Sequence, residues 1–386
     1  MVSKTTLPDT AETAPPTTIS PMMSSRIKIA RVCCILAVIY MHIPPYLIDP
    51  PTTAFSSSGI IWMIREIIGR SSVPLLSIVS GYLLVILAGS KSWSDQVGRK
   101  ILTVVVPLAL WSAVIIAKDA VLDGPATLPD VSAIPQHLFG ISGYPRNGPL
   151  YFLRDVFVSV LWTPVLLYAL ERKPWLLFAL LIANSIFNLD GVIFTNSAIV
   201  LFFAIGLAFA KGMASPDIID RHSRILAPLS FVILLAIGCL PFYANYDWIG
   251  DHEHDWALRV LQLVDRFAGA ILFWWATKAL LRFPRLVAFT VAFEPVIFFA
   301  FCGHTLIAGA IWMCFETLGF RIGGAAHLLF FATAPFVGLA ASVCATFVLS
   351  LVAPGFLALL LGGRSPSRPQ FWNMLTLGRQ ALAHLN

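Results

Sequence analysis

Arg31 and His42 are the two side chains best placed to do chemistry, because they stand eleven positions apart in the apolar run RVCCILAVIYMH. On an α-helix this spacing is about 1100°, or about 20° past three turns, so both lie on one face about 16 Å apart along the axis. An ionisable side chain inside a membrane span is expensive and therefore a functional candidate. Arg31 can attract an anion at one end of the span while His42 works at the other. A second interpretation stays open, in which Arg31 snorkels and His42 is an interfacial residue.

Other ionisable residues interrupt later apolar runs. Arg154 and Asp155 are neighbours, as are Asp265 and Arg266. Adjacent residues point about 100° apart on a helix, so each pair is expected to serve different partners rather than each other, and structural ion pairs between spans remain an alternative. Glu294 and His304 differ by about 1000°, which places them about 80° apart on loosely adjacent faces. A packed, satisfied His304 is the alternative there.

Motifs for metal or nucleotide chemistry are weak in this chain. The run Asp251, His252, Glu253, His254, Asp255 could bind a metal, but such alternation is more typical of a solvated acidic turn, so no metal site is predicted. The patterns GxGxxG, GxxxxGK[ST], HExxH and GxSxG are absent from the sequence. Nothing in it indicates a nucleic-acid partner.

The amino-acid composition indicates whether these side chains lie in a soluble protein or in a membrane protein. Of 386 residues, 58% are hydrophobic and 12% are charged, whereas soluble domains carry about 25% charged residues. Together with a mean hydropathy of +0.82, this excludes a soluble globular enzyme and predicts an all-α polytopic membrane protein.

Ten apolar ranges are long enough to be spans of about 20 residues. They are 27–48, 70–89, 101–121, 150–170, 174–190, 196–212, 225–244, 257–280, 288–314 and 328–353. An even number places both termini on one side, and most basic loop residues then fall inside and acidic ones outside, so both termini are predicted to be cytoplasmic. The expected organisation is a disordered tail over 1–25, a membrane domain over 26–353 and a short cytosolic tail over 354–386.

Four segments resemble the membrane acyltransferase-3 family, the ten-span O-acyltransferases of bacterial surface sugars. Arg31 through His42 matches the family's R-x10-H signature, and RSSVPLLSIVSGYLL is similar to its second span, with Leu76 in place of a usual aromatic residue. GRKILTVVVPL is similar to the basic entry to the third span, and GPLYFLRD to the family's L-W-F-L-R-D. In a weaker fifth match, His304 falls at the family's late-helix histidine.

The resemblance implies transfer of an acyl group, most often acetyl, from cytosolic acyl-CoA to a sugar hydroxyl outside a bacterial inner membrane. His42 would be the catalytic residue, because a neutral imidazole can deprotonate the hydroxyl or carry the acyl group, and both mechanisms stay open. Arg31, Arg99 and Lys100 would bind the CoA phosphates, with Arg31 also assisting catalysis. The expected substrate-binding residues are Arg70, Arg154, Asp155 and His304.

Acyl-CoA is expected as a donor substrate, with no permanently bound cofactor. The acceptor would be a polysaccharide or lipid-linked oligosaccharide, contacted by the outer segments 120–149 and 244–256. Three alternatives remain open. A succinyltransferase acting on a glucan is one; the second is a transporter or flippase of lipid-linked sugars, since buried ionisable residues also mark transport pathways. The third is a non-catalytic membrane scaffold.

Overall fold

All regular elements of the described chain are helices, as the sequence predicts. The computed structural model describes residues 19–45, 53, 55–89, 91–244, 256–320, 322–364, 366, 370, 371 and 376. The predicted tail is therefore covered only from residue 19, and the acidic run 251–255 lies outside the described residues.

Each predicted apolar range coincides with a helix. These are α1 (Pro21–Met41), α3 (Val73–Ile86), α5 (Val106–Leu122), α7 (Tyr151–Arg172), α8 (Pro174–Phe187), α9 (Ala198–Ala210), α11 (Ser223–Ala244), α12 (Trp256–Leu280), α13 (Pro284–Thr317) and α14 (Ala325–Val352). Among the described residues, six helical stretches are long and apolar enough to cross a membrane, and α8 and α9 are shorter apolar helices. The chain is thus a multi-pass membrane protein, while the count of ten spans and their sidedness remain predictions.

Two helical stretches begin earlier than predicted because short helices run directly into them. α2 (Ser57–Ile64) continues through the π-turn Arg65–Gly69 and the 3-10 turn Arg70–Ser72 into α3. α4 (Trp93–Lys100) continues in the same way through the π-turn Ile101–Val105 into α5. Single π-turns inside helices often occur at functional sites. Here they place Arg70 and Lys100, both predicted site residues, at irregular points of the backbone.

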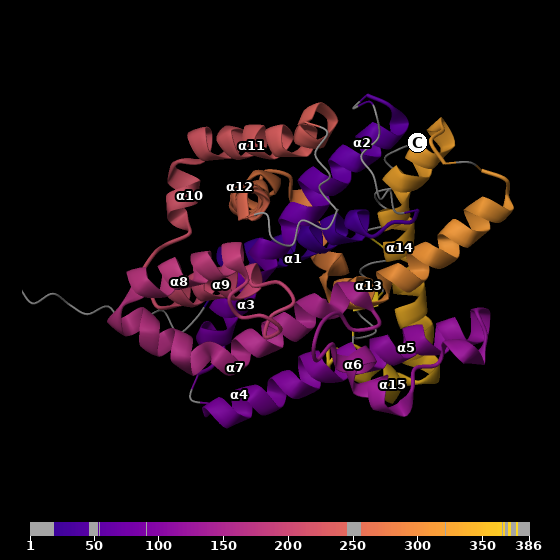
Figure 1. Ribbon diagram of the computed structural model, residues 1–386, viewed down its shortest axis with the longest axis horizontal. Coiled ribbons are helices and arrows are strands. Elements are labelled where there is room, and N and C mark those ends of the chain that lie inside the picture. Colours follow the sequence, from indigo (N-terminus) through magenta and orange to yellow (C-terminus); the bar gives the residue numbers. More distant parts are fainter. Residues whose placement is uncertain are drawn as a thin grey trace, which may run out of the picture.

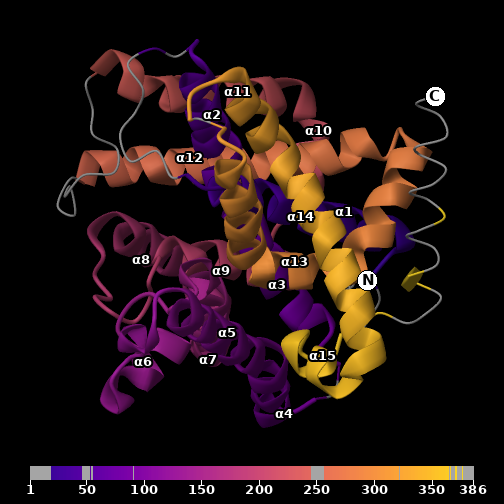
Figure 2. The same ribbon diagram turned by 90° about the vertical axis from the view of Figure 1, so that its right-hand side faces the viewer.

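α1 lies in the interior of the molecule, between α12 and α13 (Figures 1 and 2). The Ser20 hydroxyl caps its first turn by accepting a hydrogen bond from the Met23 amide at 3.2 Å. Pro21 suits the first helical position because its missing N–H needs no partner there. At the other end, His42 is the C-cap residue and precedes the Pro44–Pro45 pair, which cannot continue the helix.

The remaining helices are short. α6 (Ile134–Phe139), α10 (Asp217–Arg221) and α15 (Pro354–Leu360) connect or follow the longer ones, as do the 3-10 turns Pro125–Thr127, Val131–Ala133 and Gly148–Leu150. α15 belongs to the predicted C-terminal tail, yet Leu357 and Leu360 are buried and the Trp111 indole donates to the Leu360 carbonyl oxygen at 3.3 Å. The first part of that segment is therefore packed against α5.

Two glycines allow α3 and α9 to approach closely. A Cβ atom on Gly81 would lie 2.2 Å from the Phe203 carbonyl oxygen, and one on Gly206 would lie 2.0 Å from the Ile78 carbonyl oxygen. Small residues commonly let membrane helices pack backbone against backbone. This contact sets the position of α3, which carries the predicted second-span motif.

We expect Gly206→Ala to lower the melting temperature of the detergent-solubilised protein, because its methyl group would force two backbones apart. Gly309→Ala is the matched control, since a Cβ atom at Gly309 meets nothing within 4 Å. A loss of about 1–3 kcal/mol is typical of overpacking. Equal melting temperatures for the two variants would contradict this account of the α3–α9 contact.

Candidate active site

Arg31 and His42, the candidate functional residues of α1, each contact an ionisable residue of α13. Arg31 forms an ion pair with Glu294. The imidazole rings of His42 and His304 have centroids 5.3 Å apart and are tilted by 47°. The contacts follow the same order along both helices, so α1 and α13 run parallel. Glu294 and His304, which the sequence predicts to lie on adjacent faces of α13, thus both contact α1. Glu294 does so near the start of the α1 face that carries Arg31 and His42, and His304 does so near its end.

A cavity of about 390 Å³ lies beside the Arg31 end of α1, and we call it the Arg31 cavity. It brings together the three predicted phosphate ligands Arg31, Arg99 and Lys100, and adds Arg364. The rest of its wall is Ile35, Leu76, Val79, Ser80, Leu83, Leu84, Leu87, Ala88, Gln96, Thr103, Val104, Phe152, Leu153, Val156, Phe298 and Phe301. None of these described lining residues is a carboxylate. The cavity is therefore suited to a ligand with an anionic head and an apolar extension.

Arg364 is held at the cavity by an aromatic ring. Its guanidinium carbon lies 4.7 Å from the centroid of Phe298, within cation–π range. Burial and the neighbouring Arg31 guanidinium both lower the pKa of Arg364. The positive charges of Arg31 and Arg364 repel each other, so an anion bound between them would relieve the repulsion.

A second cavity, of about 630 Å³, lies at the His42 end of α1, and we call it the His42 cavity. Its described lining is rich in hydroxyl, amide and guanidinium groups, which suit a sugar. They come from Arg70, Ser77, Tyr144, Tyr151, Ser185, Asn188, Thr195, Asn196, Ser197, Arg259, Gln262 and Arg266. Arg70, a predicted substrate ligand, is held by Glu66 at 2.7 and 3.1 Å. Arg266 has neither a hydrogen bond nor an ion pair with the part of the chain that the structure describes.

Phe301 and His304 link the wall of the Arg31 cavity to His42. Phe301 lines the Arg31 cavity, and its ring stacks on that of His304 with centroids 6.1 Å apart. The His304 Nδ1 lies 2.5 Å from the Phe301 carbonyl oxygen. A carbonyl only accepts, so Nδ1 carries the proton and the Nε2 of a neutral His304 is an acceptor. That Nε2 atom is buried and has no hydrogen-bond partner among the described residues.

Arg154 lines neither cavity and holds two loops instead. Arg154 is 9% exposed, and its side chain donates hydrogen bonds of 2.7 to 3.0 Å to backbone carbonyl oxygens of residues 140–141 and 192–193. It also pairs with Asp155 at 2.7 Å. The expectation that these neighbours would serve different partners holds for their backbone contacts, but the expectation that they would not serve each other is wrong. Helix phase describes where Cβ atoms point, and the long arginine side chain bends back across that angle.

Asp155 also lies outside the cavities, with a fully buried carboxylate. Its two oxygens accept hydrogen bonds from the backbone amides of Thr195 and Asn196 at 3.1 and 2.8 Å. Both of these residues line the His42 cavity. The geometry gives Arg154 and Asp155 a positioning role, in which they fix the loop that forms one wall.

The sequence did not single out several lining residues. Arg364 was only one of three arginines after residue 353, and Tyr144 only a member of the segment 120–149. Arg266 had a signal, a charge inside the apolar run LVDRF, but no indication of the cavity it faces. The described residues include no group of three His, Cys, Asp or Glu that could hold a metal ion.

Comparison with known proteins defines the class of this site. A family model described as an acyltransferase domain matches residues 25–353. The chain therefore belongs to the membrane acyltransferase-3 family and is an O-acyltransferase. It is 29% identical over 367 residues to the succinoglycan biosynthesis protein ExoH of Rhizobium meliloti (strain 1021), covering 90% of this chain and 94% of that protein. No solved structure matches the chain.

We expect Asp155→Asn to destabilise the protein by about 3 kcal/mol, because it leaves the buried Arg154 without its counter-charge. The free energy of unfolding can be measured by denaturant titration in mixed micelles. Asp217→Asn, which neutralises an exposed residue of α10, is the control and should change little. If both variants unfold alike, Asp155 does not hold the loop as described.

Proposed function

We propose that the chain is an inner-membrane O-acyltransferase of exopolysaccharide biosynthesis. It would move an acyl group, most simply acetyl, from acyl-CoA in the Arg31 cavity to a sugar hydroxyl in the His42 cavity. The observation that carries this proposal is a chain of ring contacts between two chemically different cavities, from Phe301 in the wall of the Arg31 cavity through His304 to His42 in the wall of the His42 cavity. The relative's part in succinoglycan biosynthesis supports an extracellular polysaccharide as the acceptor.

The Arg31 cavity suits acyl-CoA in its charge and in its apolar wall. Its cations Arg99, Lys100 and Arg364 would bind the nucleotide phosphates by charge-assisted hydrogen bonds. The apolar wall would accept the pantetheine arm and lead it towards Phe301. The thioester would then end beside the histidine pair, at the boundary of the two cavities.

His42 would act on the acceptor. As a general base it would take the proton of a sugar hydroxyl while that oxygen attacks the thioester carbonyl carbon, and the CoA sulfur would leave as the thiolate. As an acyl carrier it would attack the carbonyl first and pass the acyl group to the sugar in a second step. His304, with its proton fixed on Nδ1, would position the His42 ring in either mechanism.

A second acyl group, succinyl, is favoured by one feature of the acceptor side. Arg266 lines the His42 cavity without a hydrogen bond or ion pair to the described chain. A succinyl group carries a free carboxylate, and a guanidinium is a good partner for it. If the acyl group is acetyl, Arg266 would bind the sugar alone. If it is succinyl, Arg266 would bind the free carboxylate of the acyl group.

The direct test is the O-acyl content of surface polysaccharide, measured by NMR in a deletion strain complemented with wild type, His42→Ala or the control His222→Ala. We expect wild type and His222→Ala to restore acylation and His42→Ala to leave it near zero at equal expression. The same spectra distinguish acetyl from succinyl.

Two results would contradict the proposal. Full acylation with His42→Ala would remove His42 from catalysis. A deletion that changes the amount of polysaccharide but not its acylation would favour a transporter.

The donor site can be tested separately in purified protein. We expect Arg364→Gln to raise KM for acyl-CoA on the order of tenfold, the cost of one lost charge-assisted contact, with kcat nearly unchanged. Lys91→Gln removes an exposed charge outside the cavity and serves as control. An unchanged KM for Arg364→Gln would place the CoA phosphates elsewhere.

A further inference from the structure

A second cluster of cations lies away from the acyl-transfer site, between α10, α11 and α12. It surrounds a cavity of about 840 Å³, which we call the α11–α12 cavity. Its basic residues Arg221, Arg224, Lys278 and Arg282 are all exposed. Its single described lining carboxylate, Asp220, is already bound by Arg26 at 2.5 and 3.1 Å. The cavity therefore carries an unbalanced positive charge.

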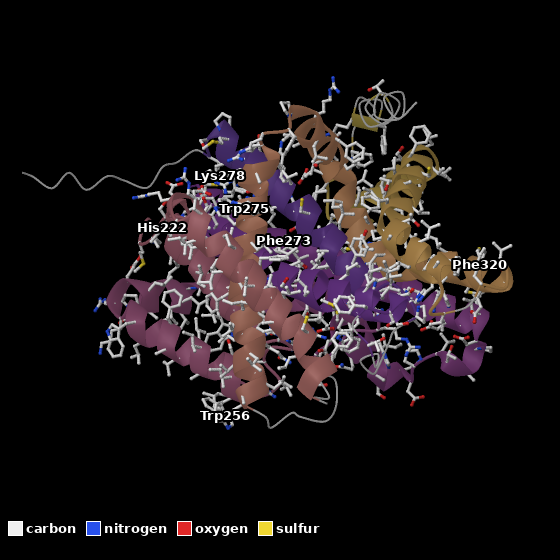
Figure 3. The ribbon with its side chains drawn as sticks, turned by 90° about the horizontal axis from the view of Figure 1, so that it is seen from above. His222, Trp256, Phe273, Trp275, Lys278 and Phe320 are labelled. Carbon is white, nitrogen blue, oxygen red and sulfur yellow. The ribbon has the colours of Figure 1, made fainter. Side chains whose placement is uncertain are left out.

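The polarity of this cavity changes along the two helices. On α11, Arg224 is followed seven residues later by Phe231, about 10 Å along the axis. On α12 the order is reversed, with Trp275 preceding Lys278, and Arg282 follows in the turn after the helix. Phe231 is 52% exposed and Trp275 is 36% exposed. Figure 3 shows Trp275 and Lys278 at one end of α12 and Trp256 at the other end.

The apolar end of the cavity continues into a second hollow. This hollow, of about 560 Å³, shares Phe231 and Leu272 with the α11–α12 cavity. Its far wall is formed by α2 and the following π-turn, including Ile60, Ile64 and Ile67. A molecule bound by the cations could thus extend an apolar chain over these side chains without leaving the protein surface.

We propose that the two connected hollows bind one anionic phospholipid, its phosphate among the four cations and one acyl chain along α2. This end of α11 and α12 is predicted to face the cytosol, where basic pockets between membrane helices suit anionic head groups. A zwitterionic lipid fits less well, because Asp220, the one carboxylate among the described lining residues, is occupied by Arg26 and cannot serve its ammonium group. A free phosphate would leave the apolar hollow unused. The site is independent of the proposed acyl transfer.

The test is lipid binding to the full chain in phosphatidylcholine nanodiscs, followed by native mass spectrometry and thermal unfolding as phosphatidylglycerol is added. We expect phosphatidylglycerol to bind and to raise the melting temperature. Arg224→Gln combined with Lys278→Gln should weaken binding on the order of tenfold. Lys91→Gln combined with Lys173→Gln removes the same charge from exposed positions elsewhere and should bind as wild type does.

Melting in pure phosphatidylcholine shows whether each variant is folded, and only folded variants are compared. Equal phosphatidylglycerol binding by the two double variants would overturn the proposal, because the attraction would then be non-specific. Equal stabilisation by glycerol phosphate, which has no acyl chain, would also overturn it and indicate a site for a soluble anion. Equal stabilisation by added phosphatidylcholine would show that the head-group charge is irrelevant.

Discussion

Polar side chains inside a membrane must find partners on neighbouring helices, and in this protein that constraint falls on α1, the first predicted span. Water is absent from the hydrocarbon, so an unpaired charge there is costly. Arg31 meets Glu294, and His42 meets His304, both on the parallel helix α13. These two contacts fix the rotation and the register of α1 against α13. Both cavities depend on this, because the α1 face that carries the contacts lines one cavity near each of its ends.

The division between the cavities follows from the residues between them. Ile35 lines the Arg31 cavity and Val38, one turn further along, lines the His42 cavity. On α13, Phe301 lines the Arg31 cavity, and His304 contacts His42, which lines the His42 cavity. Along α1, residues of the cationic, apolar-walled cavity and of the hydroxyl-rich cavity are thus within one helical turn of each other. In the proposed reaction, the acyl group would cross from one cavity to the other at this place.

α12 links several parts of the molecule. Near its middle, Arg266 faces the His42 cavity, while Lys278 and Arg282 lie at the α11–α12 cavity. Gly269 lets α12 approach the backbone at Ser71, since a Cβ atom there would lie 2.3 Å from the Ser71 carbonyl oxygen. This contact adjoins Arg70, so α12 also supports the wall of the His42 cavity.

The sequence predicted what depends on helix period and hydropathy, because those are local properties. The ten apolar ranges coincide with helices, and the spacing of Arg31 and His42 correctly indicates one face of α1. The sequence could not predict which side chains, distant along the chain, complete the site. Arg364 reaches Arg31 only through the return of the chain after α14, and the Arg154–Asp155 pair depends on side-chain reach rather than on helix phase. Neither property is encoded in residue spacing.

In the proposed reaction, acyl-CoA enters the Arg31 cavity and delivers its acyl carbon to the histidine pair. The most direct measurement is a cryo-EM structure of the protein with a non-hydrolysable thioether analogue of acyl-CoA. We predict the nucleotide phosphates at Arg99, Lys100 and Arg364, and the atom that replaces the thioester carbonyl carbon within roughly 3–5 Å of a His42 ring nitrogen. Binding in another part of the molecule, or an acyl end that stays out of reach of His42, would contradict the account.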